Sequence, residues 1–343
     1  MSAVSLPAAD EARAAASGAP GVETRAAGVT LVVPVLNTMR YLRDTVPSVL
    51  AAARCWGNAE VVYVDHGSTD GSYEFLRSLE PDGVRVIRRE GGSIGALRNA
   101  GAREGGGAYL AFVDADCLVP EGYLEEAIAA LGRTGAAATG CEARAPEGGH
   151  WIEAAWDALH FVGRDRFVHY LNSANFFISR AAFDAVGGFR EDLATGEDSE
   201  IGRRLLEARL PIWECARVSV VHLGNPRSIR EFWRRTVWHG LGMFATVGGP
   251  RFDRPLAMMA AHLACTLAGV ALLFRPGVPL PAALGGALAL QLAVPAATVA
   301  YRCAKARRVA ALAPNLALYW LYYWARLHSL ALIASGKGRR YRK

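Results

Sequence analysis

The 343-residue sequence lacks the cysteine patterns of a disulfide framework or a zinc site. Its six cysteines are scattered, with no CxxC pair and no regular spacing. The sequence also contains neither GxGxxG nor GxxxxGK[ST], so it has no dinucleotide fingerprint and no P-loop. Six thiols without a disulfide pattern are typical of a protein in a reducing compartment. Any phosphate group of a ligand must be bound in another way, and we expect a metal ion to bind it.

Acidic residues are nearly absent from the C-terminal part of the chain. After Pro250 there are 13 Lys and Arg but one acid, Asp253, whereas the preceding residues carry 25 Lys and Arg against 31 Asp and Glu. The net charge of +6 therefore does not indicate nucleic-acid binding, because the acidic part would repel a phosphate backbone. Hydrophobic residues make up 52% of the sequence, which excludes an intrinsically disordered chain.

The first 27 residues lack the uninterrupted apolar run of a signal peptide, and we expect them to form a flexible leader. From Val29, short apolar runs alternate with helix-like segments, which predicts an α/β fold with a mostly parallel sheet flanked by helices. The predicted strands are Val29–Val35, Glu60–Asp65, Val84–Arg88 and Tyr109–Asp114. Helices are expected to begin near Met39, Asp70, Ile94 and Glu121. The Ser, Thr and Asp residues at 68–70 predict an N-cap for the second of these helices.

Charge is missing altogether from two long C-terminal runs, residues 256–274 and residues 278–300. Each run is long enough to cross roughly 30 Å of hydrocarbon as a helix, so together they predict a transmembrane hairpin. A buried helix pair in a soluble protein is the alternative. Basic residues precede the first run and follow the second, so the positive-inside rule places both ends of the hairpin in the cytoplasm.

A third apolar segment, residues 316–334, carries Arg326 and His328 and leads into a basic tail at 336–343. This pattern favours a helix in the headgroup layer, with a third, tilted span as the alternative. Trp and Arg residues within 227–250 predict an amphipathic interfacial linker helix, for which a lid or a plain core helix is the alternative. The predicted organisation is summarised by its ranges: a leader over 1–27, an α/β domain over 28–226, the linker over 227–250, a membrane region over 251–335 and the tail.

Acidic residues gather where the predicted strands end. Asp65 closes the second strand, and Asp114 and Asp116 close the fourth. Ligands of open α/β sheets bind at the carboxyl ends of the strands, and carboxylates two residues apart leave a strand on the same side. We therefore expect Asp114 and Asp116 to face one divalent cation whose remaining ligands are substrate phosphates. The alternatives are a turn with a helix N-cap at Asp65–Asp70 and a chance Asp-x-Asp.

Histidine and aromatic residues further along the chain leave two interpretations open. His222 follows a short apolar run, and it could ligate the metal, contact a phosphate or be structural. Trp156 and His160 could stack on a sugar acceptor, or they could belong to a hydrophobic core.

Six motifs that occur in this order resemble glycosyltransferase family 2, whose members have the GT-A fold. The motifs are Val32–Asn37, Asp65–Asp70, Arg98–Gly101, Asp114–Asp116, Gly187–Phe189 and Gly196–Asp198. The resemblance extends from about Val29 to Gly242. It departs from the family pattern at one position, where His66 stands in place of the second of two successive acids.

The resemblance implies which residues bind the nucleotide of a nucleotide-sugar donor. Pro34, Asn37 and Asp65 would line the nucleoside pocket, with Arg98 nearby. Asp114 would lie near the ribose and the metal.

The resemblance also implies an inverting, metal-dependent transfer. Asp116 would ligate Mg²⁺ or Mn²⁺, and Asp198 would be the general base with Glu197 beside it. An inverting transfer needs a carboxylate that takes the proton of the acceptor hydroxyl, and a metal that neutralises the leaving diphosphate. Glu197 and Asp198 also suit the first turn of a helix, and both interpretations can hold together.

These features predict a glycosyltransferase attached to the cell inner membrane as a multi-pass protein, with its catalytic domain in the cytoplasm. It would transfer a sugar from a nucleotide sugar, UDP-linked by expectation, to a lipid-linked or polysaccharide acceptor. One alternative is a nucleotidyltransferase of related fold, which needs a basic triphosphate-binding loop where only Arg40 and Arg43 stand. The other alternative is a catalytically inactive membrane scaffold, which would lack a metal acid or the base.

Overall fold

The computed structural model of the chain describes residues 27–160, 163–241 and 254–337, which form two compact units. The first unit contains the chain up to Pro146 and the segment Gly163–Gly224, and the second contains Glu147–Val162 and the chain from Asn225 onward. The predicted leader, except Ala27, lies outside the described residues, as do the last nine residues of the predicted linker and most of the basic tail. The domain boundaries drawn from the sequence stay predictions.

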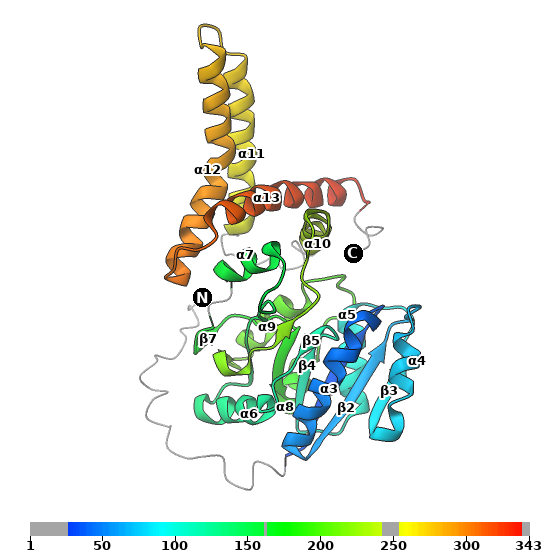
Figure 1. The fold of residues 1–343 in the computed structure, drawn as a ribbon. Coiled ribbons are helices and arrows are strands. Elements are labelled where there is room, and N and C mark those ends of the chain that lie inside the picture. Colours follow the sequence, from blue (N-terminus) through cyan, green and yellow to red (C-terminus); the bar gives the residue numbers. More distant parts are fainter. Residues whose placement is uncertain (1–26, 161–162, 242–253, 338–343) are drawn as a thin grey trace. The chain divides into compact units, whose positions relative to one another are not determined.

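The first unit is built on an eight-stranded sheet of order β3-β2-β1-β4-β8-β6-β9-β7 (Figure 1). Its strands are β1 (Val29–Val35), β2 (Ala59–Asp65), β3 (Val84–Arg88), β4 (Tyr109–Val113), β6 (Ala138–Gly140), β7 (Arg166–Val168), β8 (Asn175–Ser179) and β9 (Ile212–Glu214). β1 runs parallel to β2 and β4, β2 runs parallel to β3, and β8 is antiparallel to β4. A separate two-stranded sheet pairs β5 (Cys117–Leu118) with β10 (Val221–His222). The predicted α/β class is confirmed.

Helices of the first unit connect these strands. They are α3 (Met39–Trp56), α4 (Ser72–Arg77), α5 (Ile94–Glu104), α6 (Tyr123–Thr134), α8 (Arg180–Ala185) and α9 (Glu197–Glu207), with short 3-10 helices at Glu80–Asp82 and Ala216–Val218. The predicted strands agree with β1 to β4 within one residue at each end, and the predicted helix starts agree within two. The apolar runs mark the strands so well because β1 is buried along its whole length.

Asp70 binds the first residues of two helices, the expected α4 and also α3. The N-cap of α4 is Gly71, which has a left-handed φ of 88° and no side chain to accept a hydrogen bond. The Asp70 carboxylate accepts from the backbone N–H of Ser72, the first residue of α4, at 3.1 Å and from that of Met39, the first residue of α3, at 2.9 Å. It also accepts from the Ser72 hydroxyl at 2.6 Å. Asp70 thus ties the loop after β2 to the loop after β1.

Helix α5 lies unusually close to the sheet because its sequence supplies a glycine at the contact. A Cβ atom at Gly101 would lie 2.3 Å from the Cγ1 atom of Val32 in β1, far inside van der Waals contact. The surrounding core includes Val64, Phe112 and Phe176 from three other strands. This close packing brings the polar residues earlier in α5, among them Arg98, to the carboxyl end of the sheet.

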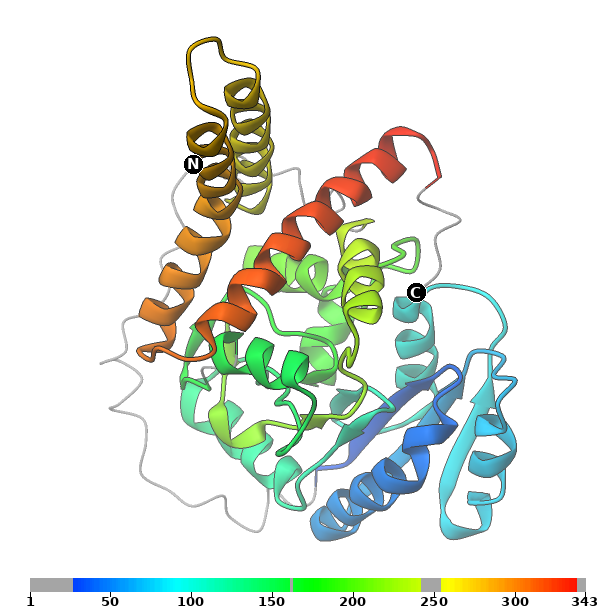
Figure 2. The same cartoon turned by 45° about the horizontal axis from the view of Figure 1, so that its top comes forward.

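The second unit is helical. Its helices are α7 (Trp151–His160), α10 (Ile229–Leu241), α11 (Arg254–Leu273), α12 (Leu280–Ala306) and α13 (Leu312–Ala334). Helices α11 and α12 form a hairpin, and α13 crosses it instead of running alongside (Figures 1 and 2). Among the described residues, α11 and α12 are the two helices long and apolar enough to span a membrane. Only 17% and 22% of their most apolar windows are buried, unlike the core helices of a soluble protein.

Specific contacts hold α13 against α10 and α7. A Cβ atom at Gly240 would lie 2.1 Å from the Ser329 hydroxyl, which itself donates to the Val237 carbonyl at 3.0 Å. The Asn315 side chain donates to the Ala155 carbonyl of α7 at 2.7 Å. The bond from Asn315 to Ala155 ties the segment Glu147–Val162 to the rest of the second unit.

Candidate active site

Asp65, at the end of β2, is fully buried, and only one of its two carboxylate oxygens accepts hydrogen bonds from the described residues. Its Oδ1 atom accepts from the backbone N–H groups of Gly67 at 2.9 Å and Ser68 at 3.1 Å, and it lies 3.8 Å from Nε of Arg88. Its Oδ2 atom is buried and has no hydrogen-bond partner in the described part of the chain. A buried acceptor without a donor is costly, so this oxygen is suited to a ligand N–H. His66, which replaces the second acid, places Nδ1 3.1 Å from the Arg89 carbonyl oxygen.

Asn37 lies next to Asp65 at the same edge of the sheet. It has a left-handed φ of 52°, a conformation that Asn tolerates better than most residues. Its side-chain Oδ1 accepts from the Thr69 backbone N–H at 2.8 Å, and its own N–H donates to the Ser68 hydroxyl at 3.0 Å. Pro34 is buried in β1, in register with Val64. The three residues predicted for the nucleoside pocket therefore lie on two neighbouring strand ends.

Asp114 and Asp116 lie in a turn, contrary to the expectation that they extend a strand. β4 ends at Val113, and the turn is closed by the Cys117 N–H, which donates to the Asp114 carbonyl at 3.0 Å. The two side chains therefore do not share one face of a strand, and they have different partners.

Asp116 faces His222, which the sequence left as a metal ligand, a phosphate contact or a structural residue. The β5–β10 pairing brings them together, and the Leu223 N–H donates to the Asp116 carbonyl at 2.8 Å. His222 Nε2 lies 3.4 Å from Asp116 Oδ1. Ligand atoms of Asp116, His222 and Cys117 lie within 4.8 Å of one another, and Asp114 is not in this group. A carboxylate with an imidazole is a donor set that fits a divalent cation.

Gly224 leaves the space that the Asp116 carboxylate occupies. A Cβ atom at this position would lie 1.8 Å from Asp116 Oδ2 and 2.8 Å from its Cγ. Gly224 could not be singled out from the sequence, because a lone glycine after a two-residue strand carries no recognisable pattern.

Arg98 is buried and paired with two carboxylates, whereas the resemblance placed it near the nucleotide. Its Nη2 donates to Asp114 Oδ1 at 2.7 Å, and its Nη1 donates to Glu197 Oε1 at 2.8 Å. The guanidinium carbon lies 5.7 Å from the centre of the Phe189 ring. Arg98 thus joins the turn after β4 to the first residue of α9.

Glu197 and Asp198 begin α9, and their environments differ. Glu197 Oε1 accepts a second hydrogen bond from the Ser173 hydroxyl at 2.9 Å. Asp198 Oδ1 accepts from the Ser199 N–H at 2.7 Å. Burial, and after it the negative charge of Glu197, raises the pKa of Asp198 to about 6. A carboxyl group with this pKa is matched to proton transfer near neutral pH.

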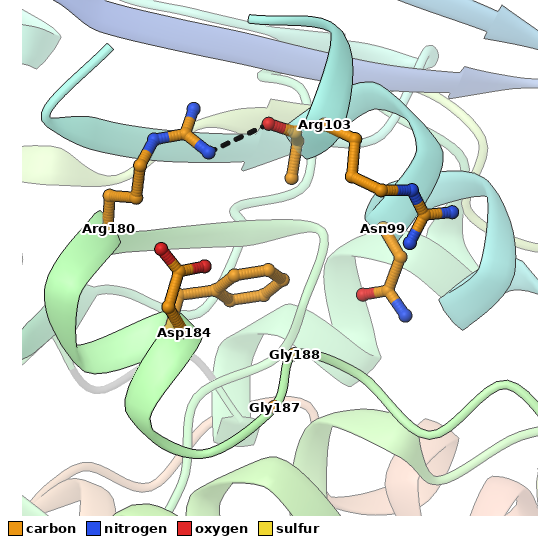
Figure 3. A pocket seen from close by; sticks show the side chains of 8 residues that line it. Asn99, Arg103, Arg180, Asp184, Gly187 and Gly188 are labelled. Atoms are coloured by element: carbon orange, nitrogen blue, oxygen red, sulfur yellow. Dashed lines mark hydrogen bonds between the residues drawn. The ribbon is translucent and has the colours of Figure 1, made fainter. Parts of the chain in front are cut away.

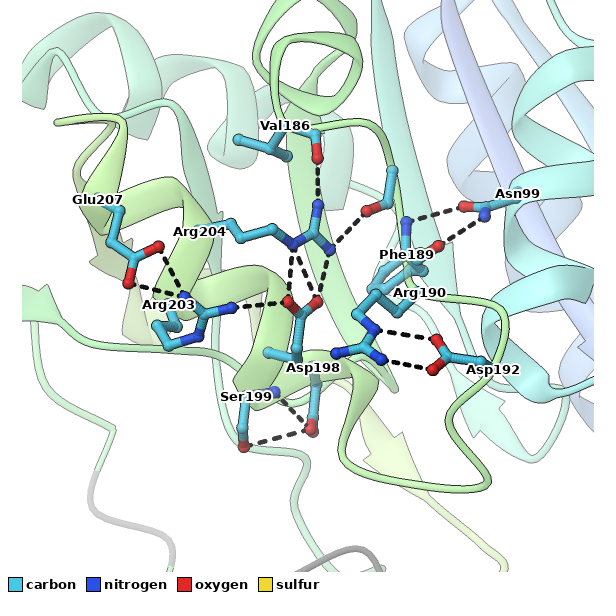
Figure 4. A network of polar contacts seen from close by, with 12 residues as sticks. Asn99, Val186, Phe189, Arg190, Asp192, Asp198, Ser199, Arg203, Arg204 and Glu207 are labelled. Carbon is cyan, nitrogen blue, oxygen red and sulfur yellow. Dashed lines mark hydrogen bonds and ion pairs between the residues drawn. The ribbon is translucent and has the colours of Figure 1, made fainter. Parts of the chain in front are cut away.

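A polar network fixes the loop between α8 and α9 that leads to Asp198 (Figure 4). The Asn99 side chain accepts from the Phe189 N–H at 2.9 Å and donates to the Phe189 carbonyl at 2.8 Å. Arg204 pairs with the buried Glu200 at 2.6 Å and donates to the Gly188 carbonyl at 2.7 Å. Neither Arg204 nor Glu200 was singled out from the sequence, since a charged pair at i, i+4 is common on exposed helices.

Replacing Asn99 by Ala will lower the free energy of unfolding by about 1–3 kcal/mol, because the buried N–H and carbonyl of Phe189 lose their partner. Thermal or chemical denaturation in detergent measures the change. Arg103→Ala, an exposed change on the same helix, is the matched control. Equal stability of the two variants would contradict the role given to Asn99.

A pocket of about 200 Å³ lies between α5 and α8 (Figure 3). It is lined by Asn99, Ala102, Arg103, Arg180, Phe183, Asp184, Gly187 and Gly188. Arg180 is committed to backbone carbonyls, among them that of Ala102 at 2.9 Å. None of the residues predicted for the site lines this pocket, so it is separate from the candidate active site.

Trp156 and His160 belong to the core of the second unit. Their rings stack at 3.9 Å, and the Tyr319 hydroxyl lies 3.0 Å from His160 Nε2. Burial lowers the pKa of His160 to about 3, so the imidazole is neutral at physiological pH. Of the two interpretations that the sequence left open for these residues, the structure gives the core.

Comparisons with known proteins identify the family. The family model described as "Glycosyl transferase family 2" matches residues 30–187, and "Glycosyl transferase family group 2" matches residues 109–326. The chain is similar to Glycosyltransferase AglE of Haloferax volcanii, with 28% identity over 52% of this chain and 62% of AglE. It is also similar to the succinoglycan biosynthesis protein ExoA of Rhizobium meliloti, with 26% identity over 60% of this chain and 66% of ExoA. The chain thus spans slightly less than two thirds of these relatives.

A solved structure supports the same fold. The mannosyltransferase PcManGT from Pyrobaculum calidifontis superposes with a TM-score of 0.58 at 20% identity, covering 89% of this chain and 87% of that one. The sheet and its flanking helices therefore have the predicted GT-A fold. With a family model matched over more than half of its length, the chain belongs to glycosyltransferase family 2.

Proposed function

We propose that this protein is an inverting, metal-dependent glycosyltransferase that uses a nucleotide sugar as its donor. We expect the donor to be a UDP-sugar. The observation that carries the proposal is Asp198, a half-buried carboxyl group at the head of α9 whose pKa rises to about 6. A general base for an acceptor hydroxyl needs this combination of position and basicity.

The reaction is a single displacement. Asp198 takes the proton of the acceptor hydroxyl as its oxygen bonds to the anomeric carbon, and the bond from that carbon to the nucleoside diphosphate breaks. Attack from the face opposite the leaving group inverts the anomeric centre, and no covalent enzyme intermediate forms.

Other residues bind the donor. The Oδ2 atom of Asp65, which has no hydrogen-bond partner among the residues that the structure describes, accepts an N–H of the base, while Pro34 and Asn37 line the nucleoside side. Asp116 and His222 would hold a divalent cation, Mg²⁺ or Mn²⁺, and Asp114 would lie near the ribose. When bound, such a cation neutralises charge on the leaving diphosphate. PcManGT was solved with GDP-Man and Mn²⁺, so a guanosine donor is the competing base identity.

The acceptor in this proposal is lipid-linked or a polysaccharide at the cytoplasmic face of the inner membrane. Helices α11 and α12 have the length, apolar character and exposure of a membrane hairpin. Helix α10 buries Phe232 and Val237 and exposes Arg230 and Arg234, as an interfacial helix does. ExoA is named for succinoglycan biosynthesis, which agrees with a polysaccharide product.

Binding of nucleoside diphosphates to the detergent-solubilised protein tests the donor site. We expect one of UDP, GDP, dTDP and ADP to bind in the presence of Mn²⁺ or Mg²⁺ and to lose at least about tenfold in affinity when the metal is chelated. Calorimetry gives both affinities. If the folded protein bound none of the four, the inactive scaffold would be the better account, and preferred binding of nucleoside triphosphates would favour a nucleotidyltransferase.

A further inference from the structure

Arg98 connects two parts of the candidate active site that lie far apart in the sequence. It is 2% exposed, and its two Nη atoms donate to Asp114 at 2.7 Å and to Glu197 at 2.8 Å. Such a side chain stays buried only because its charge is paired on both sides. Hydrogen bonds between ionised groups are short and directional. A displacement of the Asp114 carboxylate would therefore move the Arg98 guanidinium and, through it, the Glu197 carboxylate.

Glu197 is fully engaged by this arrangement, which separates its role from that of Asp198. Its Oε1 atom accepts from both Arg98 and Ser173, and its side chain is 7% exposed. The charged groups that act on Asp198 are Glu197, on the same helix, and Arg98, from α5. The guanidinium that is bonded to Glu197 therefore also acts on Asp198 through its charge, and it is bonded to the donor-side turn at Asp114.

We propose that Arg98 is a positioning residue that couples the donor-binding turn to the general base, by bonding to Asp114 and Glu197 at once and so fixing the first turn of α9. The inference rests on the proposed function. It differs from a nucleotide contact, because Arg98 acts on catalysis through Glu197 and Asp198. A ligand that draws Asp114 away leaves the guanidinium to the two carboxylates of α9, so donor binding favours the ionised base.

Arg98→Gln and Arg98→Lys in the full-length protein test the coupling through kcat, donor KM and the pH dependence of kcat/KM. With Gln, the positive charge beside the Glu197–Asp198 pair is lost, so we expect kcat to fall about tenfold or more and the acid limb to move up by about one to three pH units. Lys keeps the positive charge but cannot bond to Asp114 and Glu197 at once as the guanidinium does. In Arg98→Lys we therefore expect the acid limb of the pH profile to return toward its wild-type position, whereas kcat recovers less. An unmoved limb in Arg98→Gln, or a raised donor KM with unchanged kcat, would overturn the proposal.

Two further variants keep the test independent of folding. Arg103→Gln removes an exposed arginine of the same helix, whose ion pair is with Glu191, and it leaves kcat and the limb unchanged. The double variant Arg98→Gln with Glu197→Gln removes one charge of each sign near Asp198. We therefore expect the acid limb of the pH profile to return toward its wild-type position. A double variant that folds but keeps the limb of Arg98→Gln would contradict the coupling.

Failure of the proposed function remains distinguishable from failure of the coupling. If the wild-type protein transferred no sugar, infrared titration of the unliganded protein would still follow the Asp198 carboxyl band, with Asp198→Asn as the blank. Its midpoint rises in Arg98→Gln if the coupling exists. An identical midpoint in wild type and Arg98→Gln overturns the coupling whatever the activity.

Discussion

Replacing Asp198 by Asn will lower kcat by about 10²- to 10⁴-fold, the usual contribution of a general base. Asn has the shape of Asp but cannot take the proton of the acceptor hydroxyl. The affinity for the nucleoside diphosphate stays within about twofold, since the donor-binding residues lie on other elements of the fold. Initial rates at saturating donor, with calorimetry for the diphosphate, measure both quantities.

The matched control is Asp192→Asn, an acid on the exposed part of the loop before α9 that pairs with Arg190. It should retain wild-type turnover. Unchanged turnover of Asp198→Asn would refute the assigned base, and loss of diphosphate binding in the same variant would move Asp198 into the donor site.

The pH dependence follows from the same residue. Asp198 is protonated, and therefore inactive as a base, below its pKa of about 6, so kcat/KM rises through this pH in the wild-type protein. The ionised form also destabilises the native state, by an amount that grows as the pH rises from the ordinary Asp value of 3.8 to about 6. Asp198→Asn should thus melt no lower than wild type at pH 7.5.

Replacing Gly224 by Ala will weaken Mn²⁺ binding roughly 10- to 100-fold with little change in stability. The new methyl group would lie 1.8 Å from Asp116 Oδ2, and the φ of Gly224 is outside the left-handed region, so the backbone accepts Ala. The carboxylate must move, and it is a flexible group that moves cheaply. The substitution is therefore expected to lower the affinity for Mn²⁺ without lowering the stability of the fold.

Calorimetric titration with Mn²⁺, alongside a melting curve, checks this expectation. Asp116→Ala sets the limit of complete ligand loss. Gly122→Ala is the control, because nothing lies within 4 Å of a Cβ atom at that position. Wild-type Mn²⁺ affinity in Gly224→Ala would mean that Asp116 does not hold the metal in the conformation described.

Much of the first unit could be predicted because its signals are local. The apolar runs of β1 to β4 indicate the strands, and the ends of β1, β2 and β4 are followed by acids or an amide that the site uses: Asn37, Asp65 and Asp114. Arg98 could not be placed in the same way. Its partners Asp114 and Glu197 come from different elements, and only the folded sheet shows that one guanidinium reaches both.

The metal-binding side was harder to predict for a related reason. Asp116 and His222 meet through strands of two residues each, and such short strands leave no periodicity in the sequence. Asp114 appeared equivalent to Asp116 because two carboxylates that lie two residues apart at the end of a strand are expected to leave it on the same side. The turn that begins at Asp114 separates the two side chains, and Arg98 donates a hydrogen bond to the Asp114 carboxylate.

Sugar transfer itself tests the central claim most directly. The purified protein would be supplied with UDP-, GDP- and dTDP-sugars, Mn²⁺ and an inner-membrane lipid extract, and release of the nucleoside diphosphate would be followed together with the anomeric configuration of the product. The account predicts release from one donor class, an inverted product, and loss of both on chelation of the metal or in Asp198→Asn. A folded protein that releases no diphosphate from any donor, or a product with retained configuration, would contradict it.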